Sequence, residues 1–84
     1  MRPVFEDQGW KDHMSWLDND RKMLARVNGL IEDARRDPFS GIGRPEPLKY
    51  HLPGARSRRI DDEHRLVHPV TDKEIVVLAA RRRY

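Results

Sequence analysis

The sequence contains no cysteine in its 84 residues. This absence excludes a disulfide framework and a thiolate metal site, and it suits the reducing cytoplasm, where we expect the protein to act. Long hydrophobic runs are missing as well, since no segment approaches the roughly 20 apolar residues that a membrane span needs. The opening residues also lack the apolar stretch of a signal peptide. We therefore expect a cytoplasmic protein with no membrane partner.

The chain is short, and its 84 residues predict a single domain that covers residues 1–84. A chain of this size buries about 60–65% of the surface that its unfolded form exposes, so we expect a thin core. Residues 1–42 contain seven Lys or Arg and eight Asp or Glu, whereas residues 43–84 contain ten and six. The excess of positive charge in the second half suits a phosphate-bearing partner.

A short strand at residues 2–5 and two helices are predicted in the first half. In the first helix, Trp10, Met14 and Leu17 recur at spacings of four and three residues, which is typical of an apolar helix stripe. His13 lies along the same stripe and is predicted to be packed, not a ligand. Trp10 and Trp16 are both predicted to lie in the core and not to form a platform for stacking bases.

The second helix is predicted between residues 18 and 37, where apolar residues follow the 3.6-residue period. Asp18 or Asp20 can cap its start, and Pro38 ends it. Gly29 lies within this helix, where glycine costs about 1 kcal/mol relative to alanine, so we expect close packing there. The apolar residues of the helix are Met23, Leu24, Val27, Leu30, Ile31 and Ala34.

The second half is predicted to consist mainly of strands. A Gly- and Pro-rich loop at residues 37–48 precedes strand-like runs at residues 48–52, 57–61, 64–70 and 74–80. The last three runs follow one another at hairpin spacing, so we expect an antiparallel meander. Pro69 cannot donate a ladder hydrogen bond, so its strand should be bulged there or turn that position outward. The element order predicts an α+β domain with both helices on one face of the sheet.

Glu46 lies between two prolines, which hold its backbone in a stiff loop. It is either a solvated loop charge or a catalytic carboxylate. Arg58 and Arg59 must point to opposite faces of their strand. If Arg65 shares a face with Arg59, the two guanidinium groups form a fork suited to a phosphate. The alternative is an exposed sheet face that these arginines share with the acidic residues 61–63.

The four histidines, His13, His51, His64 and His68, show none of the spacings typical of a metal site. No nucleophile triad, P-loop or dinucleotide fingerprint is present either. We therefore expect neither a metal nor another cofactor.

The whole chain resembles the YoeB toxins of bacterial toxin–antitoxin modules, which belong to the RelE superfamily of ribosome-dependent mRNA endoribonucleases. The resemblance rests on the segments DPFSGIGRPEPLK and SRRIDDEHRLVHPVTD and on an Arg–X–X–Tyr ending at Arg81 and Tyr84. It implies two helices packed on a twisted antiparallel sheet, whose concave face holds the active site. It also implies that the protein enters the A site of the 70S ribosome and cuts mRNA there. The implied partners are a YefM-like antitoxin, a second copy in a homodimer, and operator DNA only through the antitoxin complex.

The resemblance implies roles for individual residues. Glu46 would be the base that activates the ribose 2′-OH, and Arg59 and Arg65 would stabilise the charge on the phosphorane. Lys49 would lie close to the same oxygens. Arg83 and Tyr84 would complete the catalytic set. Further RNA or phosphate contacts are expected from Arg58, Arg81 and Arg82.

The sequence departs from this family at several positions. The family ends close to ARYHY and uses the histidine as general acid, whereas this chain has Arg83, which is protonated at every relevant pH and cannot give up a proton usefully. Arg83 would then act as an electrostatic stabiliser, or His68, where the family has tyrosine, would supply the proton. Ala55 and Arg56 also replace aromatic residues, which predicts a different stability or assembly.

Three functions remain open from the sequence. The first is an active ribosome-dependent endoribonuclease with altered acid chemistry. The second is an attenuated or non-catalytic toxin that still binds the ribosome or the antitoxin. The third is a ParE-like gyrase inhibitor on the same fold, which the GRPEPLK and SRRID segments disfavour.

Overall fold

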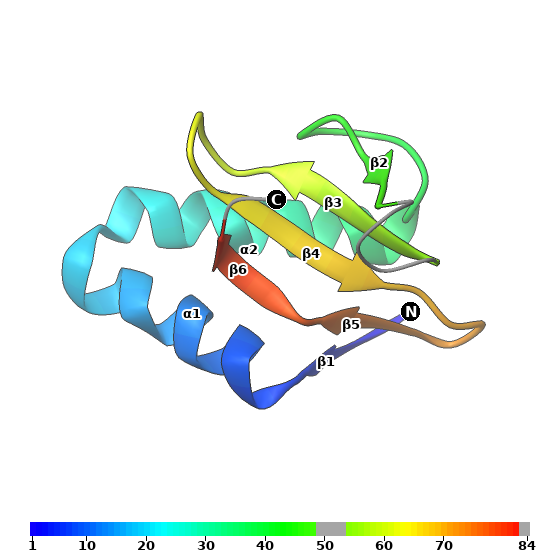
Figure 1. Ribbon diagram of the computed structural model, residues 1–84, viewed down its shortest axis with the longest axis horizontal. Helices are drawn as coiled ribbons and strands as arrows, with labels where there is room; N and C mark the ends of the chain where they lie inside the picture. The colour runs from blue at the N-terminus through cyan, green and yellow to red at the C-terminus, as the bar shows by residue number, and fades with distance from the viewer. Residues whose placement is uncertain (49–53, 83–84) are drawn as a thin grey trace.

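The computed structural model describes residues 1–48 and 54–82 (Figure 1). The chain forms a short strand, two helices and then a series of strands, which is the predicted α+β order. None of the helices in the described part of the chain is long and apolar enough to span a membrane. The elements are β1 (Arg2–Phe5), α1 (Asp7–Asn19), α2 (Arg21–Arg36), β2 (Glu46–Pro47), β3 (Ala55–Arg59), β4 (Arg65–Pro69), β5 (Glu74–Val77) and β6 (Ala79–Arg82).

The strands form two sheets. Four of them form an antiparallel sheet in the order β2-β3-β4-β6, while β1 and β5 pair in parallel. The predicted antiparallel meander is therefore correct for β3, β4 and β6, but wrong for residues 74–77, which form β5 and pair in parallel with β1. The predicted run at residues 74–80 divides at Leu78, because its first part pairs with β1 at the other end of the sequence and only its second part returns to β4.

Two further strand predictions differ in detail. Pro69 is the last residue of β4 and lies opposite Ala55, whereas the register irregularity lies between Arg65 and Val67, where β4 faces β6. The predicted run at residues 48–52 falls, apart from Leu48, outside the described residues. The strand observed in this region is β2, which lies just before it.

Helix α2 follows its sequence closely. The Asp20 side chain caps it by accepting hydrogen bonds from the backbone N–H groups of Lys22 and Met23. Four of its predicted apolar residues are buried against the sheet, and Figure 1 shows α2 behind β3 and β4. These are Val27, Leu30, Ile31 and Ala34, and they join the core with Leu66, Ile75 and Val77.

The two helical glycines have contrasting surroundings. A Cβ atom at Gly29 would meet nothing within 4 Å, so the predicted close packing at this position is wrong. A Cβ atom at Gly9 in α1 would lie 2.0 Å from the carbonyl oxygen of Val77. The close helix–strand contact therefore lies at Gly9, in the helix for which it was not predicted.

Helix α1 is rotated relative to the prediction. Its buried residues are Gly9, Asp12 and Trp16, whereas Trp10 is 50% exposed. Met14 and Leu17 are also exposed, so of the predicted core tryptophans only Trp16 is buried. Hydrogen bonds explain this orientation of α1. Asp12 and Trp16 form hydrogen bonds with the backbone of β6, so their side of the helix faces the sheet and the apolar stripe faces outward.

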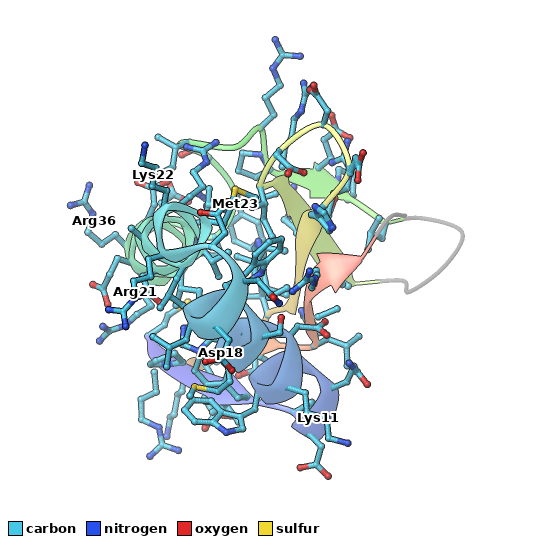
Figure 2. The ribbon with its side chains drawn as sticks, turned by 90° about the vertical axis from the view of Figure 1, so that its left-hand side faces the viewer. Lys11, Asp18, Arg21, Lys22, Met23 and Arg36 are labelled. Atoms are coloured by element: carbon cyan, nitrogen blue, oxygen red, sulfur yellow. The ribbon has the colours of Figure 1, made fainter. Side chains whose placement is uncertain are left out.

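The outward side of the helical layer is largely charged. Figure 2 shows Arg21, Lys22 and Arg36 of α2 on the side of the helices away from the sheet, and Lys11 and Asp18 of α1 are exposed as well. His13 lies inside this layer, where its ring packs against Phe5 and Trp10 and bonds to Asn28. The prediction of a packed His13 is confirmed.

Candidate functional site

Three of the residues predicted for catalysis, Glu46, Arg59 and Arg65, lie on the face of the four-stranded sheet that is turned away from the helices. Glu46 of β2 lies opposite Ser57 of β3, and Arg59 of β3 lies opposite Arg65 of β4. Residues directly opposite one another in an antiparallel pair project on the same side of the sheet. The register therefore confirms that Arg59 and Arg65 share a face.

Arg65 and Glu46 form the centre of this face. The Arg65 Nη1 atom lies 3.9 Å from Glu46 Oε2 and donates a hydrogen bond of 3.3 Å to Ser57 Oγ. The Glu46 side chain is 58% exposed and that of Arg65 is 29% exposed. A carboxylate open to solvent thus stands beside a guanidinium that Ser57 holds in place.

Arg59 is engaged with the hairpin that follows it. Its Nη2 atom forms an ion pair with the carboxylate of Asp62, and its Nε donates to the Asp61 carbonyl oxygen. Since Asp62 is almost fully exposed, this pair is open to solvent. An incoming phosphate would compete with Asp62 for Arg59.

Arg58 does not belong to this face, because its side chain is fully buried on the helical side. Its Nη1 donates to Asp33 Oδ2 at 2.6 Å and to the Ile42 carbonyl oxygen at 3.0 Å. Its Nη2 donates to the carbonyl oxygens of Asp37 and Ser40. The predicted phosphate contact does not fit this position, because the guanidinium is withdrawn from solvent and its terminal nitrogens are already occupied.

The buried guanidinium instead holds the loop that carries Glu46. A side-chain hydrogen bond from Arg58 is the main reason why the pKa of Asp33 is lowered, and the Ile42 N–H adds to it. Gly43 then accepts a bond from the Arg59 N–H and has a φ of 77°, where a Cβ would meet Leu30. Arg58 and Gly43 thus set the path of the chain into the stiff Pro45–Glu46–Pro47 segment.

Two more of the predicted residues, Arg81 and Arg82, lie on strand β6. Arg81 lies against α1, where its guanidinium carbon is 4.2 Å from the centre of the Trp16 ring and Nη1 donates to Ser15 Oγ at 2.8 Å. The backbone of Arg82 lies opposite Arg65. Lys49, Arg83 and Tyr84 lie outside the described residues, so their roles stay predictions.

His68 is fully buried, and neither ring nitrogen has a partner within the described residues. It pairs with Arg56 and follows Leu66 and Val67 along β4, which places it on the face opposite Glu46. Burial, together with the charges of Arg58 and Arg56, lowers the pKa of His68 to about 4. A neutral side chain on the wrong face cannot supply a proton at the site, so the suggestion that His68 replaces the acid is wrong.

Sequence reasoning missed the supporting residues. Ser57 holds Arg65, and its position two residues before Arg59 was the available signal, because alternate residues of a strand share a face. No comparable sequence pattern indicates that Asp33 and the loop carbonyl oxygens bind Arg58. In the described part of the chain, no three His, Asp or Glu side chains gather closely enough to hold a metal ion.

Known proteins are similar to this chain along its length. The model of the family described as "YoeB-like toxin of bacterial type II toxin-antitoxin system" matches residues 5–84. The chain is 52% identical to Toxin YoeB of Streptomyces coelicolor and 53% identical to Toxin YoeB of Mycobacterium bovis, and each alignment covers 100% of both chains.

Solved structures agree with the sequence matches. A YoeB/ParE toxin from Agrobacterium tumefaciens has a TM-score of 0.93 at 38% identity, with 100% of both chains covered. The YoeB dimer from Staphylococcus aureus has a TM-score of 0.92 at 38% identity, and the YoeB–YefM complex from the same organism has 0.89 at 36%. Both alignments cover 100% of this chain and 98% of the other.

Proposed function

Because the chain belongs to the family of YoeB-like toxins of bacterial type II toxin–antitoxin systems, we propose that it is a ribosome-dependent mRNA endoribonuclease. The observation that carries this proposal is the exposed Glu46 carboxylate beside the Arg65 guanidinium, 3.9 Å apart. Cleavage of RNA without a metal needs a base for the ribose 2′-OH and a cation for the phosphate, and this pair supplies both.

The reaction follows from this pair. Glu46 takes the proton of the 2′-OH, whose oxygen attacks the adjacent phosphorus, and the bond from phosphorus to the 5′ oxygen breaks. The products are a 2′,3′-cyclic phosphate and a 5′-OH. Arg65 stabilises the phosphorane, and Arg59 joins it when the phosphate displaces Asp62. Lys49 and Arg83 add positive charge to the same oxygens, and Tyr84 completes the set.

The leaving 5′ oxygen takes its proton from water, because Arg83 keeps its own proton at every relevant pH. A positioned general acid contributes about 100- to 10,000-fold, so we expect this protein to cut more slowly than a toxin with histidine at this place. An attenuated or non-catalytic toxin is the second candidate, and Arg83 is the residue that favours it.

The proposed partners follow the printed names of the relatives. The solved relatives include a YoeB–YefM complex and a YoeB dimer, so we propose a YefM-like antitoxin and a homodimer here as well. The exposed stripe of Trp10, Met14 and Leu17 offers an apolar surface for the second copy. The 70S ribosome and mRNA are the proposed targets, and operator DNA is bound only through the antitoxin complex.

To test this proposal, the protein is expressed in a translating extract and the 5′ ends of the mRNA are mapped. We expect cuts in the ribosomal A site from the wild type, at least about 100-fold fewer from Glu46→Gln, and more from Arg83→His. Arg36→Gln, an exposed change on the helical face, is the matched control.

Each outcome decides between the candidates. No cuts from the wild type, with cuts restored by Arg83→His, would establish the attenuated toxin. Equal cutting by wild type and Glu46→Gln would remove Glu46 as the base. Growth arrest with intact mRNA and altered DNA supercoiling would favour a ParE-like gyrase inhibitor.

A further inference from the structure

Helix α1 closes the outer edge of the sheet with its side chains. Strand β6 is the last strand in the order β2-β3-β4-β6, so one of its edges pairs with β4, and the other has no strand beside it among the described residues. Figure 1 shows α1 alongside β6, at the margin of the sheet, while α2 covers β3 and β4. Unpaired backbone groups on such an edge need other partners.

Two side chains of α1 supply these partners to a single residue of β6. Asp12 Oδ2 accepts the Ala80 N–H at 3.0 Å, and Trp16 Nε1 donates to the Ala80 carbonyl oxygen at 2.9 Å. A neighbouring strand would satisfy the same two groups of Ala80 in the same way. Asp12 and Trp16 are four residues apart and lie on one side of the helix, so together they replace a strand partner.

Asp12 is an unusual choice for this position. It is only 7% exposed, and in the described part of the chain its carboxylate accepts hydrogen bonds from the Ala80 N–H and from the Gln8 side-chain amide, which donates to Oδ1 at 2.7 Å. No ion pair with Asp12 is seen among the described residues, and withdrawing a carboxylate from water costs stability, whereas an apolar residue would pack at the same place without that cost. The carboxylate at this position is therefore better explained by its hydrogen bond to the backbone of β6 than by a contribution to the stability of the core.

The Trp16 ring also joins the two strands that bear the arginines of the site. The His64 ring meets it edge-to-face at 5.0 Å, and the Arg81 guanidinium lies over it at 4.2 Å. His64 directly precedes Arg65, and Arg81 directly precedes Arg82. One ring thus contacts the residue before each member of the facing pair Arg65 and Arg82.

We propose that Asp12 and Trp16 are positioning residues of the site, which hold β6 so that Arg82 stays opposite Arg65. This inference rests on the proposed endoribonuclease function. A displacement of about 1 Å at groups that stabilise a reacting phosphate can lower the rate about 100-fold. Neither side chain is proposed to touch RNA, so the effect is expected in kcat and not in the KM for the ribosome complex.

The test uses Trp16→Phe and Asp12→Asn in the full-length protein, purified from its antitoxin complex. Trp16→Phe keeps a ring for His64 and Arg81 but removes the N–H that binds Ala80. Asp12→Asn keeps an acceptor for the Ala80 N–H, and Asp12→Leu removes it while keeping a side chain branched at the same carbon. Asp18→Asn changes an exposed carboxylate of the same helix and is the matched control (Figure 2).

Two measurements are made on each variant. Amide hydrogen exchange at Ala80 and Arg82 reports on the edge without any RNA, and it should be at least about tenfold faster in Trp16→Phe and Asp12→Leu. Cleavage of mRNA on programmed ribosomes should show kcat lowered about tenfold at unchanged KM in both variants, with Asp12→Asn between Asp12→Leu and the wild type. Asp18→Asn should match the wild type in both.

The outcomes separate this inference from the proposed function. If exchange at Ala80 and Arg82 does not change in Trp16→Phe and Asp12→Leu, the edge is not held by these side chains and the inference is wrong. If exchange rises while kcat is unchanged, holding the edge does not position the site, and the inference is wrong again. If the wild type cuts no mRNA, the proposed function fails, and the kcat comparison is repeated in an Arg83→His background.

Discussion

Two buried basic side chains on the helical face of the sheet are held in different ways. The Arg58 guanidinium donates hydrogen bonds to the Asp33 carboxylate and to the loop carbonyl oxygens. His68 lies on the neighbouring strand of the same face and has no hydrogen-bond partner in the described part of the chain. Burial and the nearby charges of Arg58 and Arg56 keep it neutral, with a pKa of about 4.

The low pKa of His68 predicts a loss of stability in acid. A histidine in the unfolded chain has a pKa near 6.5. Between this pH and about pH 4, His68 is therefore protonated in the unfolded chain but neutral in the folded chain. The contribution of His68 is therefore fully present above about pH 6.5, and it falls by about 2 kcal/mol at pH 5 and about 3 kcal/mol at pH 4. Urea unfolding of wild type and His68→Phe at these pH values should show the smaller loss in the variant. Equal losses would contradict the assignment.

The clamp formed by Arg58 predicts a large loss of stability when it is removed. Arg58→Met leaves Asp33 and three carbonyl oxygens without their donor, and breaking a buried pair on one side costs on the order of 3 kcal/mol. Arg58→Lys should recover only part of this stability, because a single ammonium group cannot reach both the partners of Nη1 and the partners of Nη2. Arg36→Met, on an exposed side chain of α2, is the control in the same urea unfolding measurement. A loss as small as that of the control would show that the clamp is not needed.

At the scale of the elements, α2 could be predicted almost completely and α1 only as a helix. The sequence of α2 has an Asp cap, a 3.6-residue apolar period and a stop at Pro38, and the structure has all three. In α1 the apolar period points to Trp10, Met14 and Leu17, yet Asp12 and Trp16 face the sheet. The face of α1 is set by hydrogen bonds to Ala80, 68 and 64 residues away, which no local pattern can express.

Replacing the two helical glycines by alanine is predicted to change the stability of the protein in opposite directions. Gly29→Ala adds a methyl group in open space and removes the conformational freedom of glycine, so it should stabilise the protein by about 0.5–1 kcal/mol. Gly9→Ala would place a methyl group 2.0 Å from the Val77 carbonyl oxygen, so it should destabilise the protein by at least about 1 kcal/mol as α1 moves off β5. Thermal unfolding of the two variants measures both, and the same sign in both would contradict the packing described for α1.

The site could be predicted in its centre but not in its surroundings. Strand alternation was enough to separate Arg58 from Arg59, whereas the shared face of Arg59 and Arg65 depends on the register of β3 and β4, which the sequence left open. The same alternation could not tell that Arg58 is the buried one, since this depends on Asp33 and the loop lying behind the sheet. The pairing of β5 with β1 was also missed, because it joins residues 72 positions apart.

At the scale of the whole molecule, the exposed stripe on α1 predicts self-association. Trp10 is 50% exposed, and Met14 and Leu17 are exposed beside it. If a second copy covers this stripe, Trp10→Ala with Leu17→Ala should weaken the dimer at least about 30-fold, as loss of a central aromatic contact does. Sedimentation velocity over a range of concentrations measures this, with Lys11→Ala as control. A double variant that associates as tightly as the wild type would place the interface elsewhere.

The parallel pairing of β1 with β5 sets an order of events during synthesis. Residues 2–5 are made long before their partners, residues 74–77, and Ile75, Val77 and Ala80 are fully buried in the core. Contacts between distant parts of a chain form late in folding. The core therefore cannot close while residues 74–80 are still inside the ribosome that makes them. On the proposed function, the chain cannot cut any mRNA before this segment has been made and released.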